Sequence, residues 1–395
     1  MQSNTEQRLV HSFGINNAFT TTNEKRYLEF KKEAVHKVHL TNDKWQRLAE
    51  EAQMIIKGSL SDSRIPLMPY IQILTLRIVL SIMFDVDALA LSQAAIDVVT
   101  ASINDLWKKS KLASTPNDAF QSQHRFRVAL HDLLPDHDLD DPTSNPLNLI
   151  LPAYETLWRI VLLGFVEIRF RTRHGDTQSA CTFALRAFLA DPSGPDNSRK
   201  SSTREDIESD GTRNITAFDI ARELLRLYPS TKRVYRVFDS SPDLTAPVSV
   251  AADVEAIDRS TAIWGASAGA FDPSRWVPSV TVVDMEKEKE KEKERRDAYM
   301  PFGVYPFLCP ARKDFGRRII ALLVASLVVG VGVGAEVGVG KGAKEEEGKG
   351  EEEDGWRLEV PEGWRDVVSK GEEPLPSERG SFEGWALVKR EDVRT

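Results

Sequence analysis

The sequence predicts a mainly α-helical fold with a minor β region towards the C-terminus. Apolar residues recur at spacings of three and four over much of the chain, which is the period of a buried helix face. Two apolar stretches, Leu67–Val86 and Asn145–Phe170, are too long for strands and fit core helices. Short β-like runs with turn signals occur at Arg233–Phe238 and Val248–Ile257. At about 150 residues per domain, the length of 395 residues corresponds to two or three domains or to one large domain.

The composition of the chain excludes several classes of protein. Its 395 residues include 52 Lys and Arg against 60 Asp and Glu, and the net charge of −8 argues against a broadly basic nucleic-acid surface. The two cysteines, Cys181 and Cys309, exclude a disulfide scaffold and any all-cysteine zinc or iron–sulfur site built from this chain alone. The polar N-terminus shows neither a signal peptide nor an anchor helix, so we expect an intracellular, reducing compartment.

The first part of the chain is predicted to form a series of helices. Residues 1–22 are polar and are expected to be a loop. Helices are expected over Asn23–Ile56, Leu67–Val86, Ala88–Leu112 and Ser122–Leu134. The second of these is apolar enough to suggest a membrane span, but an arginine and a proline inside it favour a helix buried in the protein.

The longest apolar stretch, Asn145–Phe170, contains Pro152, Glu155, Arg159 and Glu167. A lipid-facing helix would not carry a glutamate and an arginine four residues apart near its middle, because each charge there costs a few kcal/mol. We therefore expect a long helix in the protein core. The proline removes one backbone hydrogen bond and bends the helix locally, a defect that often marks a site.

The second part of the chain alternates helices with segments of biased composition. Helices are expected at Thr182–Ala190, Thr216–Tyr228 and over the first half of Ile319–Gly334. The second of them begins with a capping box, in which Thr216 is the N-cap residue and Asp219 its partner. Three segments are set apart by composition: a flexible connection at 191–214, a charged insertion at 286–297 that is either a solvated helix or disordered, and a low-complexity insertion at 341–355.

Cys309 is the residue whose surroundings point most clearly to chemistry. It follows a Phe-Gly turn and an apolar segment, and it stands directly before Pro310, which is favoured in the first turn of a helix. At the N-cap position, unpaired N–H groups and the positive helix end favour a thiolate. A thiolate in an apolar loop without a second cysteine suits an axial ligand of haem iron, whereas the alternative is a buried, inert cysteine.

Several motifs follow one another in the order found in one enzyme family. Phe302, Gly303 and Cys309 match the cysteine-loop signature F-G-x-G-x-R-x-C-x-G at the same spacing, and Glu223 and Arg226 match an E-x-x-R on an amphipathic helix. From about residue 12 onwards, the chain resembles the cytochrome P450 family of haem-thiolate monooxygenases, and specifically its fungal members. The resemblance implies that the cysteine loop binds haem.

The segment FDPSRW at 271–276 is similar to the P-x-R-[FW] motif of the same family. The resemblance implies that Arg275 completes a Glu–Arg–Arg network. Because Glu223 and Arg226 lie three residues apart on one helix face, an arginine from a distant loop can bind the same carboxylate. A buried charge left unpaired there costs several kcal/mol, so we expect the network to fix the segment that carries the cysteine.

The resemblance also places an oxygen-activation motif, [AG]-G-x-[DE]-T, in the long apolar helix. Glu155 and Thr156 match its acid and its alcohol, whereas Pro152 and Ala153 depart from it. The implied role is proton delivery to dioxygen, with the helix defect leaving room for water and oxygen. The alternative is an ordinary i,i+4 pair between Glu155 and Arg159.

Haem propionates need cationic partners, and the resemblance implies where these lie. Tyr27 and Lys31 occupy an aromatic and a basic position four residues apart, and Arg233 or Arg236 follows in the first β-like run. The alternative for the first pair is an exposed basic helix face.

The chain departs from the family pattern at two places. In the cysteine loop, Tyr305, Phe307 and Ala311 replace a glycine, a basic residue and a second glycine. A tyrosine disfavours a positive φ, and loss of the basic residue removes one propionate contact. By the resemblance, we also expect the chain to begin partway into the family fold. The resemblance therefore implies a single cytochrome P450-like domain over residues 1–395, with a truncated cytochrome P450 fold that lacks its N-terminal helix and strands.

By this resemblance, the expected function is that of a haem-thiolate monooxygenase. Cys309 would bind the iron of haem b, O2 would be activated near Glu155 and Thr156, and one oxygen atom would enter a small apolar substrate. Electrons would come from NADPH through a separate reductase, at the cytoplasmic face of the endoplasmic reticulum, although no membrane anchor is visible in this chain. The alternatives are a pseudoenzyme that keeps the scaffold with or without haem, and a haem-thiolate isomerase or dehydratase that needs no reductase.

Overall fold

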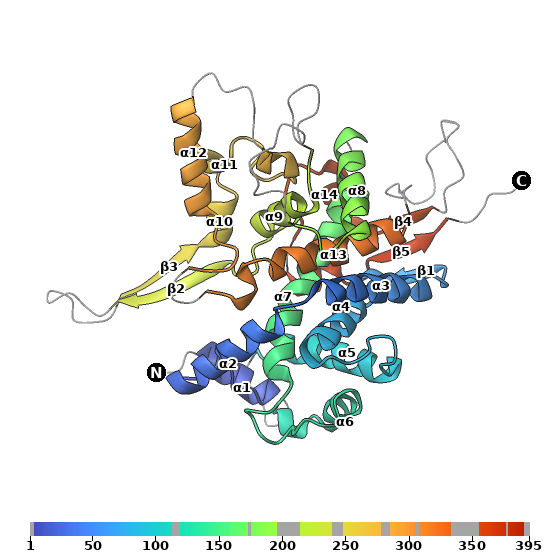
Figure 1. The fold of residues 1–395 in the computed structure, drawn as a ribbon, viewed down its shortest axis with the longest axis vertical. Coiled ribbons are helices and arrows are strands. Elements are labelled where there is room, and N and C mark those ends of the chain that lie inside the picture. The colour runs from blue at the N-terminus through green and yellow to red at the C-terminus, as the bar shows by residue number, and fades with distance from the viewer. Residues whose placement is uncertain are drawn as a thin grey trace, which may run out of the picture. The chain divides into compact units, whose positions relative to one another are not determined.

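Helices make up most of the structure, as the spacing of the apolar residues predicts (Figure 1). The structure is a computed structural model that describes residues 4–112, 119–172, 175–195, 214–238, 248–277, 285–304, 308–332, 355–376 and 378–390. The chain divides into two compact units, the first formed by Met1–Leu162 and Phe382–Thr395 and the second by Leu163–Ser381. Helix α7, Leu147–Val166, contributes residues to both units.

The first unit consists of helices and one small antiparallel strand pair. Its helices are α1 (Asn4–Phe13), α2 (Glu24–Lys37), α3 (Asn42–Ser59), α4 (Leu67–Phe84), α5 (Gln93–Lys109), η2 (Phe120–Ser122), α6 (His124–Leu133) and most of α7. Strand β1 (Arg64–Pro66) pairs with β5 (Ala386–Lys389), with Ile65 opposite Leu387. Asn23 and Thr41 cap α2 and α3 through their side chains, which explains why the helical stretch predicted over 23–56 is divided in two.

Residues 4–13 form helix α1, so the prediction of a loop over residues 1–22 is wrong for this part of the chain. Phe13 at its end is fully buried. The side-chain amide of Asn145 donates to the carbonyls of Phe13 (3.0 Å) and Gly14 (3.2 Å). The helix is mostly polar and its end is held by a residue far along the chain, so local sequence carries little signal for it.

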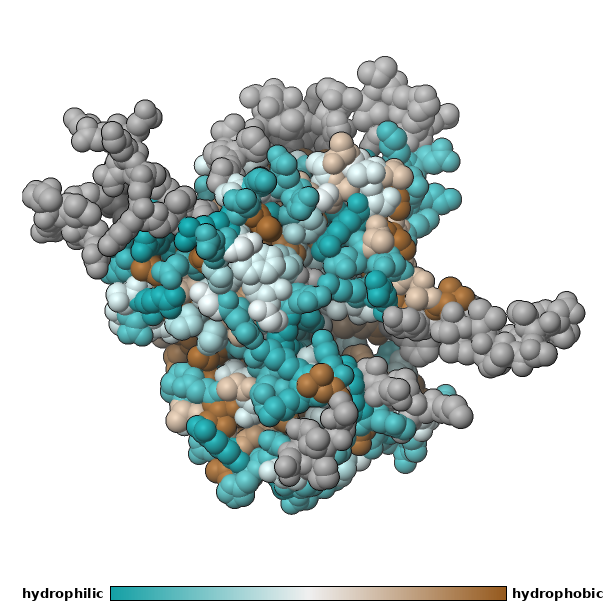
Figure 2. Space-filling model, turned by 180° about the vertical axis from the view of Figure 1, so that it is seen from behind, coloured by the Kyte–Doolittle hydropathy of each residue, from teal (hydrophilic) through white to brown (hydrophobic). Residues whose placement is uncertain are grey.

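Helices α4 and α7 are strongly apolar and lie in the protein interior. By length and composition, Leu67–Phe84 and Leu147–Arg171 are long and apolar enough to cross a membrane, but 83% and 78% of their apolar windows are buried inside the protein. This burial agrees with the prediction of core helices. Figure 2 shows a face covered mainly by hydrophilic residues, on which hydrophobic side chains stand singly or in small groups.

The second unit holds the remaining elements. They are the end of α7, the π-helical segment η3 (Glu167–Arg171), α8 (Gly175–Ala190), α9 (Ala217–Leu227), β2 (Arg233–Phe238), β3 (Val248–Asp253), α10 (Val254–Asp258), α11 (Thr261–Trp264), η5 (Pro273–Trp276), α12 (Met285–Ala298), η6 (Pro310–Arg312), α13 (Phe315–Gly330), β4 (Trp356–Glu359), η7 (Glu362–Trp364), α14 (Arg365–Lys370) and most of η8 (Arg379–Phe382). Strands β2 and β3 form an antiparallel hairpin with Arg233 opposite Asp253. The β-like run predicted to reach Ile257 ends at Asp253, because this residue caps the short helix α10.

Helices α8, α9 and α13 pack against one another in the second unit. The capping box of Thr216 and Asp219 is present at the start of α9, as predicted. At the end of α7, a Cβ at Gly164 would lie 2.5 Å from the side chain of Leu224 in α9. Glycine therefore allows α7 and α9 to approach closely at this point.

The segments of biased composition are only partly covered by the structure. The charged insertion at 286–297 lies within helix α12, whose last residue, Ala298, packs with Trp264 and Ala268. Most of the predicted flexible connection at 191–214 and most of the low-complexity insertion at 341–355 lie outside the described residues.

Candidate functional site

The loop that carries Cys309 is closed by backbone hydrogen bonds in the second unit. The N–H of Cys309 donates to the carbonyl of Phe302 (2.9 Å), and the N–H of Gly303 donates to that of Met300 (3.1 Å). Gly303 has a φ of +74°, a left-handed conformation that favours glycine. Cys309 is the N-cap residue of η6, and the N–H of Arg312 donates to its carbonyl (3.2 Å). The Phe-Gly turn is therefore held beside the cysteine.

A glycine in α13 makes room for the aromatic ring of this loop. A Cβ at Gly316 would lie 2.5 Å from the ring of Phe302 and 3.0 Å from the carbonyl oxygen of Ala311. Carbon atoms in contact are normally about 3.5–4.0 Å apart, so only glycine leaves the ring in this place. Sequence analysis missed this residue, and a glycine in the first turn of an apolar helix is the signal that could have found it.

The thiol of Cys309 differs from the expectation that a helix end favours its thiolate. The surrounding loop excludes enough water to raise the pKa of Cys309, and a hydrogen bond from the N–H of Ala311 offsets this only in part. The helix that follows is the three-residue η6, and α13 begins only at Phe315, so the helix dipole contributes little at the sulfur. Cys309 nevertheless is exposed. Tyr305 and Phe307 lie outside the described residues.

Glu223 and Arg226 form a buried bidentate ion pair in α9. Arg226 donates from Nε to Oε2 (2.9 Å) and from Nη2 to Oε1 (2.7 Å) of Glu223, and both side chains are 0% exposed. Arg275 binds the same carboxylate, with its Nε 3.4 Å from Oε1. The indole N–H of Trp276 donates to Oε2 (3.0 Å), and the N–H of Asp272 donates to Oε1 (3.1 Å). The three residues of the expected network therefore meet on one carboxylate, where five donated hydrogen bonds offset its burial.

The two arginines also hold backbone carbonyls between the end of α10 and residue 268. Arg226 donates from Nη1 to the carbonyls of Asp258 (2.5 Å) and Ala268 (2.7 Å). Arg275 donates from Nη1 to the carbonyl of Trp264 (2.7 Å). Such bonds to main-chain oxygens cannot be predicted from residue types, because every residue carries a carbonyl.

Asp258 is a buried carboxyl group beside this network. Its side chain is 1% exposed, and neither carboxylate oxygen has a hydrogen-bond partner among the described residues. Burial raises the pKa of Asp258 to about 7, although the positive charges of Arg226 and Arg259 lower it. Sequence analysis gave no role to this residue.

An aromatic contact connects the network to the cysteine loop. The ring centres of Trp276 and Tyr299 are 4.9 Å apart, and the hydroxyl of Tyr299 donates to the carbonyl of Arg222 (3.3 Å). Burial raises the pKa of Tyr299 well above its ordinary value. Because Tyr299 directly precedes the Met300–Gly303 turn, the network anchors the loop of Cys309. Sequence analysis missed this tyrosine, and its place next to the loop motif is the available signal.

Pro152 interrupts the hydrogen bonding of α7, and the structure shows how the defect is satisfied. Proline has no N–H, so the carbonyl of Asn148 loses its helical donor. The side-chain amide of Asn17 donates to this carbonyl at 3.1 Å, and the N–H of Asn16 donates to Oδ1 of Asn148 at 2.8 Å. The segment after α1 therefore completes the start of α7. Sequence analysis missed these three asparagines.

Glu155 and Thr156 lie in the next turn of α7, in the first unit. Glu155 is 3% exposed, whereas Thr156 is partly exposed, as are Pro152 and Ala153. Arg159 donates from Nε to the backbone carbonyl of Glu155 (3.0 Å). This is a main-chain bond rather than the side-chain ion pair considered as the alternative. The role of Glu155 and Thr156 as an acid–alcohol pair stays a prediction.

The residues expected to meet haem propionates lie in different units. Tyr27 and Lys31 share α2, where the Nζ of Lys31 is 5.8 Å from the centre of the Tyr27 ring. Arg233 pairs with Asp253 across the β2–β3 hairpin, with 3.2 Å between Nε and Oδ2, and both side chains are exposed. The side chain of Arg236 lies outside the described residues. Contact of these groups with propionates stays a prediction.

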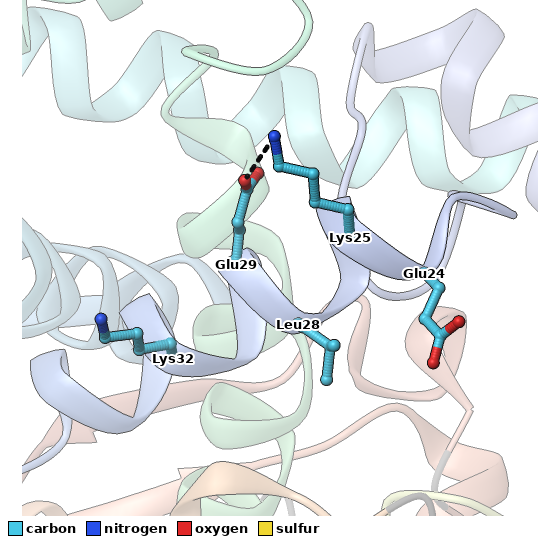
Figure 3. Close-up of a pocket in the computed structure, with 5 residues that line it drawn as sticks. All are labelled: Glu24, Lys25, Leu28, Glu29 and Lys32. Carbon is cyan, nitrogen blue, oxygen red and sulfur yellow. Dashed lines mark ion pairs between the residues drawn. The ribbon is translucent and has the colours of Figure 1, made fainter.

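A surface pocket on α2 is formed by other residues. It is lined by Glu24, Lys25, Leu28, Glu29 and Lys32, which all belong to one helix (Figure 3). Lys25 and Glu29 form an exposed ion pair with 3.9 Å between Nζ and Oε1, of a kind that contributes little to stability. A depression made by a single helix cannot enclose a prosthetic group, and none of the five residues belongs to the expected site.

The structure brings some of the expected site residues together and leaves others in separate units. The second unit holds the cysteine loop with Phe302, Gly303 and Cys309, and the network of Glu223, Arg226 and Arg275. The first unit holds Tyr27, Lys31, Glu155 and Thr156. Across the part of the chain that the structure describes, no group of three or more His, Cys, Asp or Glu residues could hold a metal ion. The role of the Cys309 sulfur as a metal ligand stays a prediction.

The fold is the cytochrome P450 fold, mainly helical with a small sheet region. CYP175A1 from Thermus thermophilus is similar with a TM-score of 0.51 at 17% identity, over 82% of this chain and 74% of that chain. A mutant of cytochrome P450SPα (CYP152B1) is similar with a TM-score of 0.50 at 13% identity, over 97% of this chain and 84% of that chain. A cytochrome P450 OleT variant in complex with arachidonic acid is similar with a TM-score of 0.53 at 12% identity, over 99% of this chain and 84% of that chain. Likeness at such identities establishes the fold, and the fungal resemblance stays a prediction.

The sequence itself has no match among protein-family models or curated proteins.

Proposed function

We propose that the chain is a haem-thiolate enzyme in which the sulfur of Cys309 binds the iron of haem b. The geometry of the cysteine loop carries this proposal. The loop holds Cys309 through the carbonyl of Phe302 (2.9 Å), and the N–H of Ala311 donates to the sulfur. The cysteine is also exposed. An accessible sulfur that accepts a backbone N–H fits a metal-bound thiolate, because the N–H and the cation both stabilise its negative charge.

The residues of the chain have separate roles in this proposal. Haem, when bound, supplies an iron at which dioxygen is activated. Cys309 donates its sulfur, and the N–H of Ala311 stabilises negative charge on that sulfur. Glu155, which is buried, and Thr156, which is partly exposed, are assigned to proton transfer. The propionates are assigned to Tyr27, Lys31, Arg233 and Arg236.

At a finer level, the proposed reaction is insertion of one oxygen atom from O2 into a small apolar organic substrate. Electrons come from NADPH through a separate reductase, and the proposed location is the cytoplasmic face of the endoplasmic reticulum. The family resemblance of the motifs supports both points. One similar structure contains arachidonic acid, and this long apolar molecule supports an apolar substrate class.

A haem-free pseudoenzyme is the second candidate function. The departures of the cysteine loop favour it, because Tyr305, Phe307 and Ala311 replace a glycine, a basic residue and a second glycine of the family pattern. In that case the Glu223–Arg226 network would serve only to hold the scaffold together.

The carbon monoxide spectrum of the reduced protein tests the assignment of the ligand. Native protein is expected to show a thiolate-type spectrum, which Cys309→Ala abolishes. Cys181→Ala is the matched control, since Cys181 is fully buried in α8 and burial raises its pKa to about 12. A thiolate-type spectrum that persists in Cys309→Ala contradicts the site, and native protein purified without haem from haem-replete cells supports the pseudoenzyme.

Turnover separates the remaining alternatives. Oxidation of an apolar substrate that requires both NADPH and an added reductase supports the monooxygenase. Conversion of a substrate by haem-containing protein without reductase supports the isomerase or dehydratase instead.

A further inference from the structure

A second buried charge network lies at the C-terminal end of α7, in the second unit. Glu167, Arg171 and Tyr228 are 2%, 3% and 2% exposed. Both the hydroxyl of Tyr228 and the Nη1 of Arg171 donate to Oε1 of Glu167. Glu167 and Arg171 are the first and last residues of the π-helical segment η3, and Tyr228 is the C-cap residue of α9. The three side chains therefore tie the end of one core helix to the end of another.

The same network holds a third segment, Glu372–Leu375, which follows α14. Arg171 donates from Nη2 to the carbonyls of Val367 (3.2 Å) and Glu373 (2.5 Å). The N–H of Leu375 donates to the hydroxyl oxygen of Tyr228 (3.0 Å). The hydroxyl of Tyr228 thus both donates and accepts a hydrogen bond, so its polar group is satisfied although it is buried.

Electrostatics make the network sensitive to the loss of any one member. Burial raises the pKa of Glu167, whereas Arg171 and the hydrogen bond from Tyr228 lower it. Burial and the negative charge of Glu167 raise the pKa of Tyr228 well above its ordinary value, so the phenol keeps its proton. Removing one partner leaves a buried polar group unsatisfied, which is more costly than the bond itself is worth.

The segment Glu372–Leu375 lies beside Gly269, in the stretch of chain whose carbonyls accept from Arg226. A Cβ at Gly269 would lie 3.4 Å from the carbonyl oxygen of Glu372, so the two backbones are neighbours. Gly269 stands between Ala268 and Ala270, whose carbonyls accept from Nη1 and Nη2 of Arg226 at 2.7 Å and 3.3 Å. The segment therefore lies next to the backbone of residues 268–270, which supplies two of the carbonyls that accept from Arg226.

We propose that Glu167, Arg171 and Tyr228 are positioning residues that hold Glu372–Leu375 against the carbonyl acceptors of Arg226. Through Arg226 they stabilise the network that anchors the loop of Cys309. The functional part of this inference rests on the proposed haem-thiolate function. The structural part stands on the hydrogen bonds alone.

Amide hydrogen exchange of the full chain tests the structural part. Tyr228→Phe removes the acceptor of the Leu375 N–H, so exchange at Leu375 is expected to be about fivefold to tenfold faster, the effect of losing one hydrogen bond. Tyr70→Phe is the matched control, because the buried hydroxyl of Tyr70 in α4 has no hydrogen-bond partner among the described residues. Unchanged exchange at Leu375 in Tyr228→Phe, or equal acceleration over the whole chain, overturns the proposal.

A conservative variant separates positioning from simple loss of stability. Glu167→Gln keeps an oxygen that accepts from Tyr228 and Arg171, so its exchange at Leu375 should stay near that of native protein, whereas Glu167→Ala should accelerate it. In the reduced, carbon monoxide-bound protein, Tyr228→Phe should lower the thiolate-type fraction at least about twofold at equal haem content, since one lost bond shifts an equilibrium by about that factor or more. An unchanged fraction overturns the link to Cys309. A native protein without a thiolate-type spectrum refutes the proposed function and that link with it, and exchange at Leu375 still decides the structural part.

Discussion

Asp258 offers a direct test of the electrostatics around the Glu223–Arg226 network. Its carboxyl group is 1% exposed, and among the described residues no donor reaches it. The folded-state pKa is raised from 3.8 to about 7, chiefly by burial. The folded protein therefore keeps a proton on Asp258 between these pH values, while the unfolded chain releases it. The free energy of unfolding consequently falls as the pH rises from about 4 to 7, and this contribution is constant above and below that window.

Asp258→Asn removes this dependence, because an amide does not ionise. A rise in pKa from 3.8 to about 7 corresponds to roughly 4 kcal/mol of stability lost at pH 8, which is an upper bound for the gain in the variant. An unsatisfied amide offsets part of it, at about 1–3 kcal/mol. Because this offset does not depend on pH, we expect Asp258→Asn to be about 1–3 kcal/mol more stable than native protein at pH 8 and about 1–3 kcal/mol less stable near pH 4.

The assay is urea denaturation of both proteins over pH 4–8.5, with the difference in unfolding free energy plotted against pH. Asp253→Asn is the control, because Asp253 caps the other end of α10, asparagine caps helices equally well, and the pKa of Asp253 is lowered by its hydrogen bonds. This control should show no gain at high pH. An Asp258→Asn variant that is less stable than native protein at every pH, with a flat difference, refutes the reasoning and shows that Asp258 is ionised and paired.

The remaining predictions concern the network, the cysteine loop and the start of α7. Glu223→Ala and Arg226→Ala should each lower the unfolding free energy by about 3–5 kcal/mol, and the double variant should lose clearly less than their sum; additive losses in urea denaturation would place the two charges apart. Gly316→Ala should push the ring of Phe302 from its place, at a cost of about 1–3 kcal/mol and with lower haem content, whereas alanine at Gly363, which has open space around it, should be neutral. Asn17→Ala should lower the free energy of unfolding by about 1–3 kcal/mol, because the carbonyl of Asn148 loses its donor. An unchanged thermal unfolding temperature would show that water replaces the lost side chain.

Local sequence determined those features that depend on neighbouring residues. The start of α9 follows from Thr216 and Asp219, since a capping box needs only residues three positions apart. The burial of α4 and α7 follows from their long apolar runs, which lose too much free energy in water. Glu223 and Arg226 were predicted to share a helix face, and they pair across one turn.

Tertiary structure alone decided the features that depend on distant backbone. Helix α1 was predicted as loop, because the residue that holds its end, Asn145, lies far along the chain and gives no signal in the local sequence. The acceptors of Arg226 are carbonyls, which every residue carries, so no residue type marks them. The raised pKa values of Cys309 and Asp258 depend on how much water the folded chain excludes. Spacing along a sequence specifies partners within a helical turn, whereas desolvation and long-range acceptors exist only once the chain has packed.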